Sequence, residues 1–135
     1  MKNKIVFVSI ISEDPVFYLA MEAMFKHYAE GVMVKIYTSL AELRDSKITT
    51  NSDLILVDEI VAGAAIFEVI SYLRSNRKET CSIFYFAKDV HDIKTRAFRR
   101  GANYFYSKPF DPRMVVYEIV NNWVSISKKD FKSIL

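Results

Sequence analysis

The chain has 135 residues, 51% of them hydrophobic, and its 19 Lys and Arg against 16 Asp and Glu give a formal net charge of +3. This length suits one domain with one well-buried core, and three Gly and three Pro leave little room for long irregular loops. The single cysteine, Cys81, excludes an internal disulfide, and the apolar runs are shorter than the ~20 residues of a membrane span, so a cytoplasmic protein is expected. The mild net charge disfavours nucleic-acid binding.

The first half of the chain alternates short β-rich runs with helical segments. Residues 5–11 are almost entirely apolar and β-branched, as expected of a strand that is buried on both faces. Pro15 begins a helix that Asp14 or Ser12 caps, and apolar residues recur at helical spacing until Gly31 ends it. The next predicted elements are a strand at 32–37, a short helix at 39–43 and a buried strand at 53–58.

The second half repeats this alternation and completes five strands and five helices. A helix is predicted at 64–74, with Ile66, Val69, Ile70 and Leu73 facing inward, and a strand at 81–87 follows it. The next helix runs from Asp89 or Asp92 to Gly101, with Val90, Ile93 and Ala97 inward, and precedes an aromatic strand at 102–107. The last helix begins at Pro112, is capped by Asp111, and buries Val116, Ile119, Val120 and Trp123. The pattern predicts a parallel sheet with right-handed crossovers and helices on both faces.

In such a sheet, ligands bind beyond the carboxyl ends of the strands, so the residues that follow each strand are the candidates for chemistry. Glu13 follows the first strand, Asp58 ends the third, and Lys108 follows the fifth. Carboxylates suit Mg²⁺, and a lysine neutralises the charge of a transferred phosphoryl group. Asp58 is the candidate nucleophile, because carboxylates form acyl phosphates in phosphoryl transfer.

Three segments, residues 53–58, 67–74 and 101–111, together resemble the receiver domain of response regulators. The resemblance runs from about Lys4 to Trp123, and its most distinctive part is the stretch Gly-Ala-Asn-Tyr-Phe-Tyr-Ser-Lys-Pro-Phe. It implies a flavodoxin-like (βα)5 three-layer sandwich whose parallel five-stranded sheet has the strand order 2-1-3-4-5. The receiver domain would cover residues 1–124, and residues 125–135 would form a helix extension, a tail or the start of a linker.

The resemblance also implies roles for particular residues. Asp58 matches the phosphoacceptor and Lys108 the family's lysine. Mg²⁺ would be held by Glu13, Asp58 and the backbone carbonyl of Ile60. The peptide bond before Pro109 is expected to be cis, because cis bonds are essentially a proline feature.

Several positions depart from the family's pattern, among them Ala62 in place of the usual proline and Ile66 in place of the usual glycine. Ser12 and Glu13 stand where the family has an acidic pair, so one carboxylate is missing and the other is lengthened. Phe86 stands where the family has a Thr or Ser, although Phe105 matches the aromatic switch residue. A phenyl ring cannot donate the hydrogen bond that senses a phosphoryl oxygen. Phe86 would either simply fill the core or occupy the space of the switch and fix the domain in one state.

The resemblance implies a receiver of two-component (phosphorelay) signalling that accepts a phosphoryl group on Asp58 from a histidine kinase or phosphotransfer protein. Its signal would pass through the face of the fourth helix, fifth strand and fifth helix to a downstream protein or a fused output domain, and a homodimer would use the same face. Such a domain is not an enzyme beyond its own phosphorylation and dephosphorylation. The alternative is a pseudo-receiver, a protein-interaction module that works without phosphorylation, and Ser12, Glu13 and Phe86 favour it.

Two further interpretations are less favoured. A flavin- or nucleotide-binding protein of the same architecture needs N–H groups free for phosphate after the first strand, but Ser12 to Pro15 (Ser-Glu-Asp-Pro) repels anions and removes a donor. The chain would also suit the receiver part of a transcription factor. Nothing in it resembles a helix-turn-helix, so this chain is not expected to bind nucleic acid directly. Its short apolar runs give no reason to expect a membrane partner.

Overall fold

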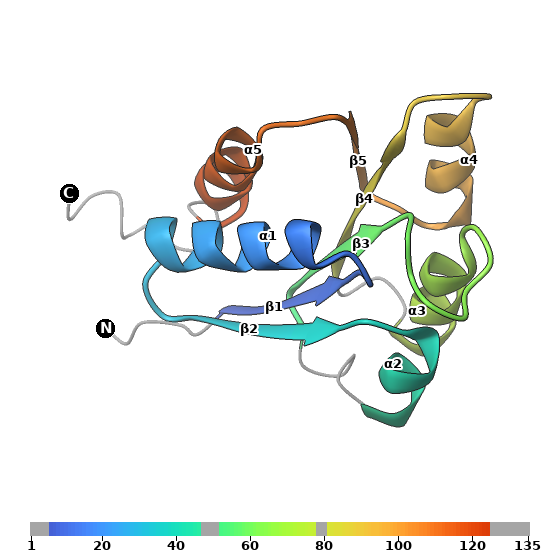
Figure 1. The fold of residues 1–135 in the computed structure, drawn as a ribbon, viewed down its shortest axis with the longest axis horizontal. Helices are drawn as coiled ribbons and strands as arrows, with labels where there is room; N and C mark the ends of the chain where they lie inside the picture. Colours follow the sequence, from blue (N-terminus) through green and yellow to red (C-terminus); the bar gives the residue numbers. More distant parts are fainter. Residues whose placement is uncertain (1–5, 47–51, 78–80, 125–135) are drawn as a thin grey trace.

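A parallel five-stranded sheet forms the centre of the molecule, with helices on both of its faces (Figure 1). The computed structural model describes residues 6–46, 52–77 and 81–124. The strands are β1 (Val6–Ile11), β2 (Val32–Tyr37), β3 (Leu54–Asp58), β4 (Ser82–Lys88) and β5 (Tyr104–Lys108). Their order is β2-β1-β3-β4-β5, which confirms the flavodoxin-like architecture and the strand order expected from the sequence.

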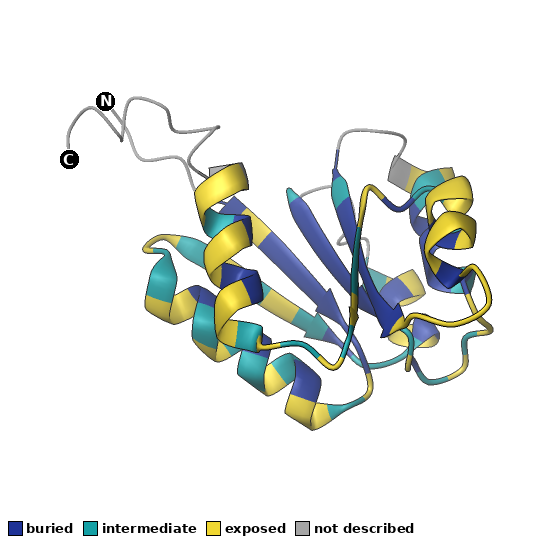
Figure 2. Ribbon diagram, turned by 90° about the horizontal axis from the view of Figure 1, so that it is seen from above, coloured by how far each residue is buried: buried dark blue, intermediate teal, exposed yellow. Residues whose placement is uncertain are grey.

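The helices divide into two layers with separate hydrophobic cores. The helices are α1 (Pro15–Tyr28), α2 (Leu40–Ser46), α3 (Glu68–Arg77), α4 (Ile93–Arg100) and α5 (Pro112–Ile119), and a π-helical turn (Val120–Val124) follows α5. α1 and α5 share one core with one face of the sheet, and α2, α3 and α4 share the other core with the opposite face. Figure 2 shows β3 and most of β4 as buried strands between the helices, whose outer faces are exposed.

The two helices of the α1–α5 layer begin with the same capping device. Asp14 accepts a hydrogen bond from the Val16 backbone N–H, and Asp111 accepts one from that of Arg113, each at 3.0 Å. A proline follows each cap at the first helical position, where its missing N–H leaves no hydrogen bond unmade. These starts were predicted from the sequence and are confirmed.

The start of α3 and the orientation of Ile66 differ from the sequence prediction. α3 begins at Glu68, four residues later than expected, and Ile66 is 53% exposed where it was expected to face inward. Phe67 has a positive φ of 67°, which turns the chain just before the helix and places its ring in the core in place of Ile66. The Glu68 side chain then accepts the Ala65 N–H at 2.9 Å.

The prediction that Val90 faces inward is also wrong, because its side chain is 51% exposed. A tight turn joins β4 to α4: the Val90 N–H bonds to the carbonyl of Lys88 at 3.0 Å, and His91 and Asp92 both have positive φ. The turn directs Val90 outward before the helix begins at Ile93. Periodicity cannot reveal this, since it assumes one continuous helix.

The end of α5 agrees in part with the prediction. Val116 and Ile119 are buried as expected, Val120 is half-buried, and Val115 is buried although the sequence did not predict it. The Trp123 side chain and the predicted extension at 125–135 lie outside the described residues. Within the described parts of the chain, no helix is long and apolar enough to cross a membrane.

Candidate functional site

The site lies at the carboxyl edge of the sheet and takes its residues from the ends of three strands. β3 ends in Asp58, β5 ends in Lys108, and Ser12 follows the last residue of β1. The parallel pairings β1–β3, β3–β4 and β4–β5 bring these ends to one rim. Asp58 is 1% exposed and Ser12 is fully buried, so the carboxylate is removed from bulk water.

Both oxygens of the Asp58 carboxylate are in contact with other side chains. The Ser12 hydroxyl donates a hydrogen bond to Oδ2 at 2.6 Å. The Lys108 ammonium lies 2.5 Å from Oδ1. Oδ1 accepts no hydrogen bond of normal geometry from the described residues, so the Lys108 contact acts there chiefly as an ion pair. Because burying a carboxylate is costly without partners, Ser12 and Lys108 together offset the cost of placing Asp58 at this depth.

The orientation of the Ser12 hydroxyl is fixed by a second hydrogen bond. Its oxygen accepts the backbone N–H of Asp14 at 3.0 Å, and the same Asp14 caps α1. A hydroxyl has one hydrogen to donate, and Asp58 is its acceptor here. The start of α1 thereby holds Ser12 as a donor toward Asp58.

Lys108 lies between two carboxylates and not one. Its ammonium is 3.3 Å from Glu59 Oε2 as well as 2.5 Å from Asp58, and it sits 5.8 Å from the centroid of the Phe17 ring. The other oxygen of Glu59 is 3.4 Å from the backbone N of Lys88, a long hydrogen bond. Sequence reasoning missed Glu59, although its place directly after Asp58 was a signal that it lies at the same rim.

The other two predicted metal ligands, Glu13 and Ile60, lie beside each other close to the same rim. The Glu13 residue is exposed, while its backbone N–H donates to the carbonyl of Ile60 at 2.9 Å. The Ile60 carbonyl is therefore engaged by the chain itself. The structure brings Asp58 and Lys108 together, and it joins Glu13 to Ile60 through their backbones.

The residues at this rim do not fit a resident Mg²⁺ ion. Among the described residues, no three or more His, Cys, Asp or Glu side chains form a group able to hold a metal. The Ser12 hydroxyl already donates to one Asp58 oxygen and the Lys108 ammonium contacts the other, whereas Mg²⁺ demands near-ideal octahedral geometry from free oxygen ligands.

Phe86, beside Asp58 in the sheet, is the centre of an aromatic cluster. The ring is fully buried and packs edge-on against Phe17 at 5.1 Å, stacks on Tyr106 at 5.3 Å and lies 5.1 Å from Phe110. Phe105, at the position of the aromatic switch, is half-buried on the other face of the sheet, where its ring is 6.3 Å from that of Tyr85.

Two tyrosines near the site have raised pKa values. Burial is the main cause of the raised pKa of Tyr85, and the negative charges of Glu59 and Asp58 raise it further. Burial also raises the pKa of Tyr106, whose hydroxyl donates to Glu118 at 2.7 Å, and the carboxylate of Glu118 adds to the shift. Both hydroxyls therefore remain protonated at neutral pH.

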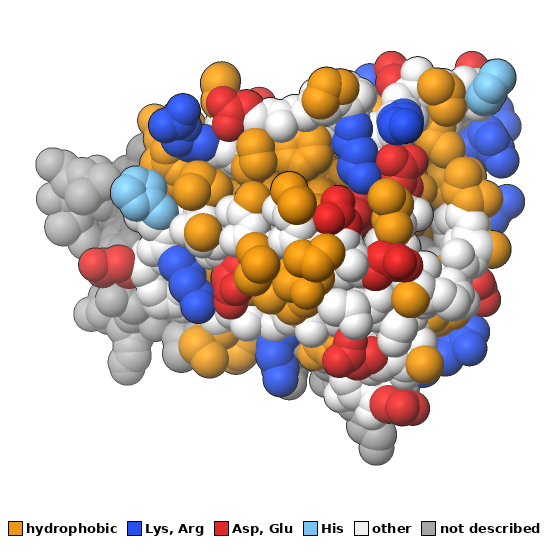
Figure 3. Space-filling view, in the orientation of Figure 1, with side chains coloured by type: hydrophobic (Ala, Val, Ile, Leu, Met, Phe, Trp, Pro, Cys, Tyr) orange, Lys and Arg blue, Asp and Glu red, His pale blue; other side chains and the backbone are white. Residues whose placement is uncertain are grey.

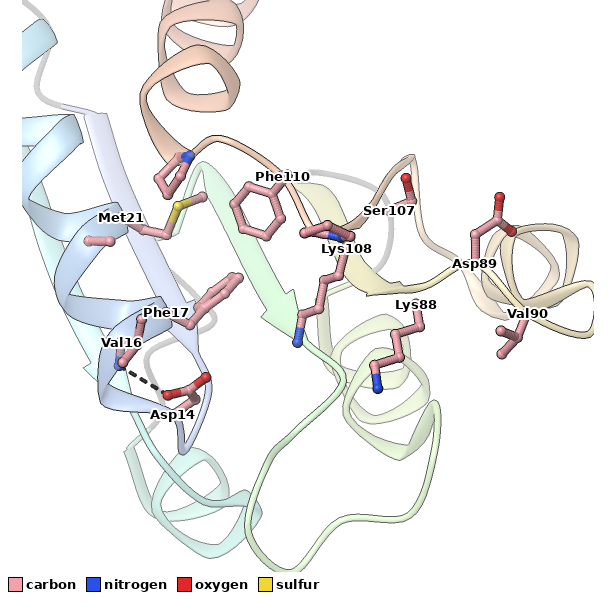
Figure 4. A pocket seen from close by; sticks show the side chains of 13 residues that line it. Asp14, Val16, Phe17, Met21, Lys88, Asp89, Val90, Ser107, Lys108 and Phe110 are labelled. Carbon is pink, nitrogen blue, oxygen red and sulfur yellow. Dashed lines mark hydrogen bonds between the residues drawn. The ribbon is translucent and has the colours of Figure 1, made fainter.

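A groove of about 680 Å³ opens beside the site, between the start of α1 and the segments that follow β4 and β5. Figure 4 shows Phe17, Met21 and Phe110 on its α1 side, with Lys88 and Lys108 projecting from neighbouring strands. On the face that carries α1 and β2, acidic and basic side chains are interspersed and form no large patch of one sign (Figure 3).

The strand order and the carboxyl-edge site define a doubly wound α/β protein of the flavodoxin-like class. No protein-family model matches the sequence, and a search of curated proteins finds no match either. Solved structures place the fold more closely: it is that of response-regulator receiver domains.

Three of these structures illustrate the likeness. The signal receiver domain of a DNA-binding response regulator from Colwellia psychrerythraea has a TM-score of 0.77 at 16% identity, over 89% of this chain and 98% of that one. A CheY-like receiver domain protein from Methanospirillum hungatei has a TM-score of 0.75 at 16% identity, over 93% and 99% of the two chains. The chemotaxis response regulator CheY4 of Vibrio cholerae has a TM-score of 0.74 at 15% identity, over 88% and 98%. At such identities the likeness establishes the fold.

Proposed function

We propose that this chain is a receiver-type module of two-component signalling that acts by binding partner proteins, and that its output does not require a phosphoryl group on Asp58. The receiver fold of the structural neighbours supports the signalling role. The observation that carries the second half of the proposal is the packing of Phe86. This pseudo-receiver function was the alternative in the sequence prediction, and the geometry favours it.

Phe86 occupies the position from which a hydroxyl would report on a phosphoryl group at Asp58. Its ring has no hydrogen-bond donor, is fully buried, and is held by Phe17, Tyr106 and Phe110. A ring held by contacts on three sides cannot change rotamer without opening cavities, which packed interiors resist. The path that would carry a signal from Asp58 to β5 is therefore filled by a rigid apolar contact.

A second candidate function is the phosphorylation-driven receiver, with Asp58 as phosphoacceptor. The contact between Asp58 and Lys108 favours it, because a lysine in this place stabilises negative charge that develops on a phosphoryl group. A histidine kinase or phosphotransfer protein would be the donor under this hypothesis. The absence of a fitting Mg²⁺ site and the ring of Phe86 weigh against it.

Intact-mass measurement after incubation with a small acyl phosphate donor and Mg²⁺ separates the two. We expect no labile single-phosphoryl adduct on the wild-type chain under conditions that phosphorylate an ordinary receiver run in parallel. An adduct that disappears in Asp58→Asn and moves the amide NMR signals of α4 and β5 would establish the second candidate and refute the proposal. An adduct without any response in α4 and β5 would leave Asp58 reactive but the output independent of it.

We also propose α4, β5 and α5 as the partner-binding face. Phe98 on α4, Tyr104 on β5 and Tyr117 on α5 are 41%, 47% and 54% exposed, and exposed apolar groups of this kind favour protein contact. A downstream protein, a fused output domain or a second copy of the chain would bind there. Sedimentation of the wild type against Tyr104→Asp tests the dimer: a dimer that persists in the variant would place that interface elsewhere.

A further inference from the structure

We propose that Ser12 closes the Asp58 site against divalent cations. The identity of this residue, and not only the number of carboxylates at the rim, decides whether a metal can bind there. The inference concerns cation binding and goes beyond the proposed output. A chain that binds a cation at Asp58 can still signal without phosphorylation, so each claim has its own test.

The Ser12 hydroxyl is oriented so that it competes with a cation for Asp58. The Ser12 oxygen accepts the Asp14 N–H at 3.0 Å and donates to Asp58 Oδ2 at 2.6 Å. A cation bound to Oδ2 would have to displace this donor. The Ser12 hydroxyl would then have to turn its hydrogen away within a fully buried environment. Leaving a buried donor without an acceptor costs about 1–3 kcal/mol, and that cost opposes every cation bound at this oxygen.

The local charge around Asp58 is also too small to attract a divalent cation strongly. The ammonium of Lys108 contacts Asp58 at 2.5 Å and Glu59 at 3.3 Å, so these three groups sum to a charge of −1. An acidic side chain in place of Ser12 would add a negative charge beside Asp58 and also remove the competing donor. A single unit charge matters here, because interactions between charges at ~4 Å are several-fold stronger in a partly buried site than in bulk water.

The available oxygen ligands also disfavour a cation. The carbonyl of Ile60 already accepts the N–H of Glu13 at 2.9 Å, and the two Asp58 oxygens already contact Ser12 and Lys108. Mg²⁺ and Mn²⁺ favour six oxygen ligands in octahedral geometry, several of them water. The wild-type rim supplies too few such ligands, and Ser12→Asp would replace the hydroxyl that donates to Asp58 with a further carboxylate.

The test is a Mn²⁺ titration followed by paramagnetic broadening of the amide NMR signals around residues 12–14 and 58–60. Wild type is compared with Ser12→Asp, with Ser12→Ala, and with Thr95→Asp. The last adds the same charge on the exposed face of α4, away from the site, and serves as the matched control. Ser12→Asn, which adds an oxygen ligand without charge, takes the place of Ser12→Asp if the latter does not fold.

We expect site-specific, saturable broadening in Ser12→Asp, with an apparent affinity for Mn²⁺ at least about tenfold tighter than in wild type or Thr95→Asp. Ser12→Ala removes the competing donor without adding charge, so its affinity is expected to lie between those of wild type and Ser12→Asp. Should Ser12→Asn be used, broadening stronger than in Ser12→Ala supports the inference. Saturable binding near Asp58 in wild type as tight as in the position-12 variant would overturn it. So would a folded position-12 variant that binds no more tightly than wild type.

Discussion

The tight packing of Phe86 can be tested directly by truncating its side chain. Phe86→Ala removes a fully buried ring that touches three other rings at centroid distances of 5.1 to 5.3 Å. Truncating a buried Phe to Ala typically costs about 3–5 kcal/mol in the free energy of unfolding. Aromatic pairs contribute roughly 0.5–1.5 kcal/mol each beyond the area they bury, so three of them place this site near the upper end, at about 4–5 kcal/mol.

Urea denaturation followed by far-UV circular dichroism measures this loss. With a slope of roughly 2 kcal/mol per molar urea, the midpoint is expected to fall by about 2 M. Phe86→Leu is the matched control, because it keeps an apolar side chain of similar size and is expected to cost less than about 1.5 kcal/mol. Native domains have only about 5–15 kcal/mol of stability, so Phe86→Ala removes a large fraction of it.

A loss below about 1.5 kcal/mol in Phe86→Ala, or equal losses in the Ala and Leu variants, would refute the reasoning. Either result would mean that the ring is not tightly held by its neighbours. The space at Phe86 would then be open to rearrangement, and the main argument for a fixed, phosphorylation-independent state would fail with it.

Three further outcomes are expected. Ser12→Ala removes a hydrogen bond to a buried carboxylate and is expected to lower the free energy of unfolding, measured by urea denaturation, by about 1.5–3 kcal/mol. An unchanged free energy of unfolding would mean that the hydrogen bond to Asp58 does not form. Lys108→Met leaves Asp58 buried without its cation and is expected to cost roughly 3 kcal/mol by the same measurement, and a neutral result would show that water or another group replaces the lysine. Because burial raises the pKa of Tyr85 in the folded state, the stability that this residue contributes is present below about pH 10 and is lost as the pH rises further, by up to ~1.4 kcal/mol per pH unit. Tyr85→Phe is expected to weaken that decline between about pH 10 and 11, and an unchanged decline would assign it to other groups.

These variants have internal controls. Asp58→Asn combined with Lys108→Met removes both charges of the pair, and it is expected to be less destabilising than Lys108→Met alone, because no uncompensated carboxylate remains.

Much of the fold follows from local sequence signals. The buried strands read as apolar runs because helices cover both faces of a parallel sheet. The pairs Asp14–Pro15 and Asp111–Pro112 start helices at the residues where the structure has them. The predictions fail at Ile66 and Val90, each close to a non-glycine residue with positive φ, because helical periodicity carries no information about a turn that interrupts it.

The site was predictable in outline and not in detail. Asp58 and Lys108 were placed together from the rule that parallel strands end at one rim, and their contact of 2.5 Å agrees with it. Glu59 was missed, since whether a residue after a strand turns toward the rim depends on the path of the following loop. Glu13 is exposed, and its role as a metal ligand stays a prediction.

The sequence by itself determined which chemical groups exist at the rim: a neutral hydroxyl at Ser12, a carboxylate at Asp58, an ammonium at Lys108 and a ring without a donor at Phe86. Only the tertiary structure decided that the hydroxyl donates to the carboxylate and that the ammonium also contacts Glu59. It also decided that three other aromatic rings pack around the ring of Phe86. The physical reason is range. Hydrogen bonds and packing contacts act over a few ångströms, and residues separated by dozens of positions come within that distance only through the pairing of the strands.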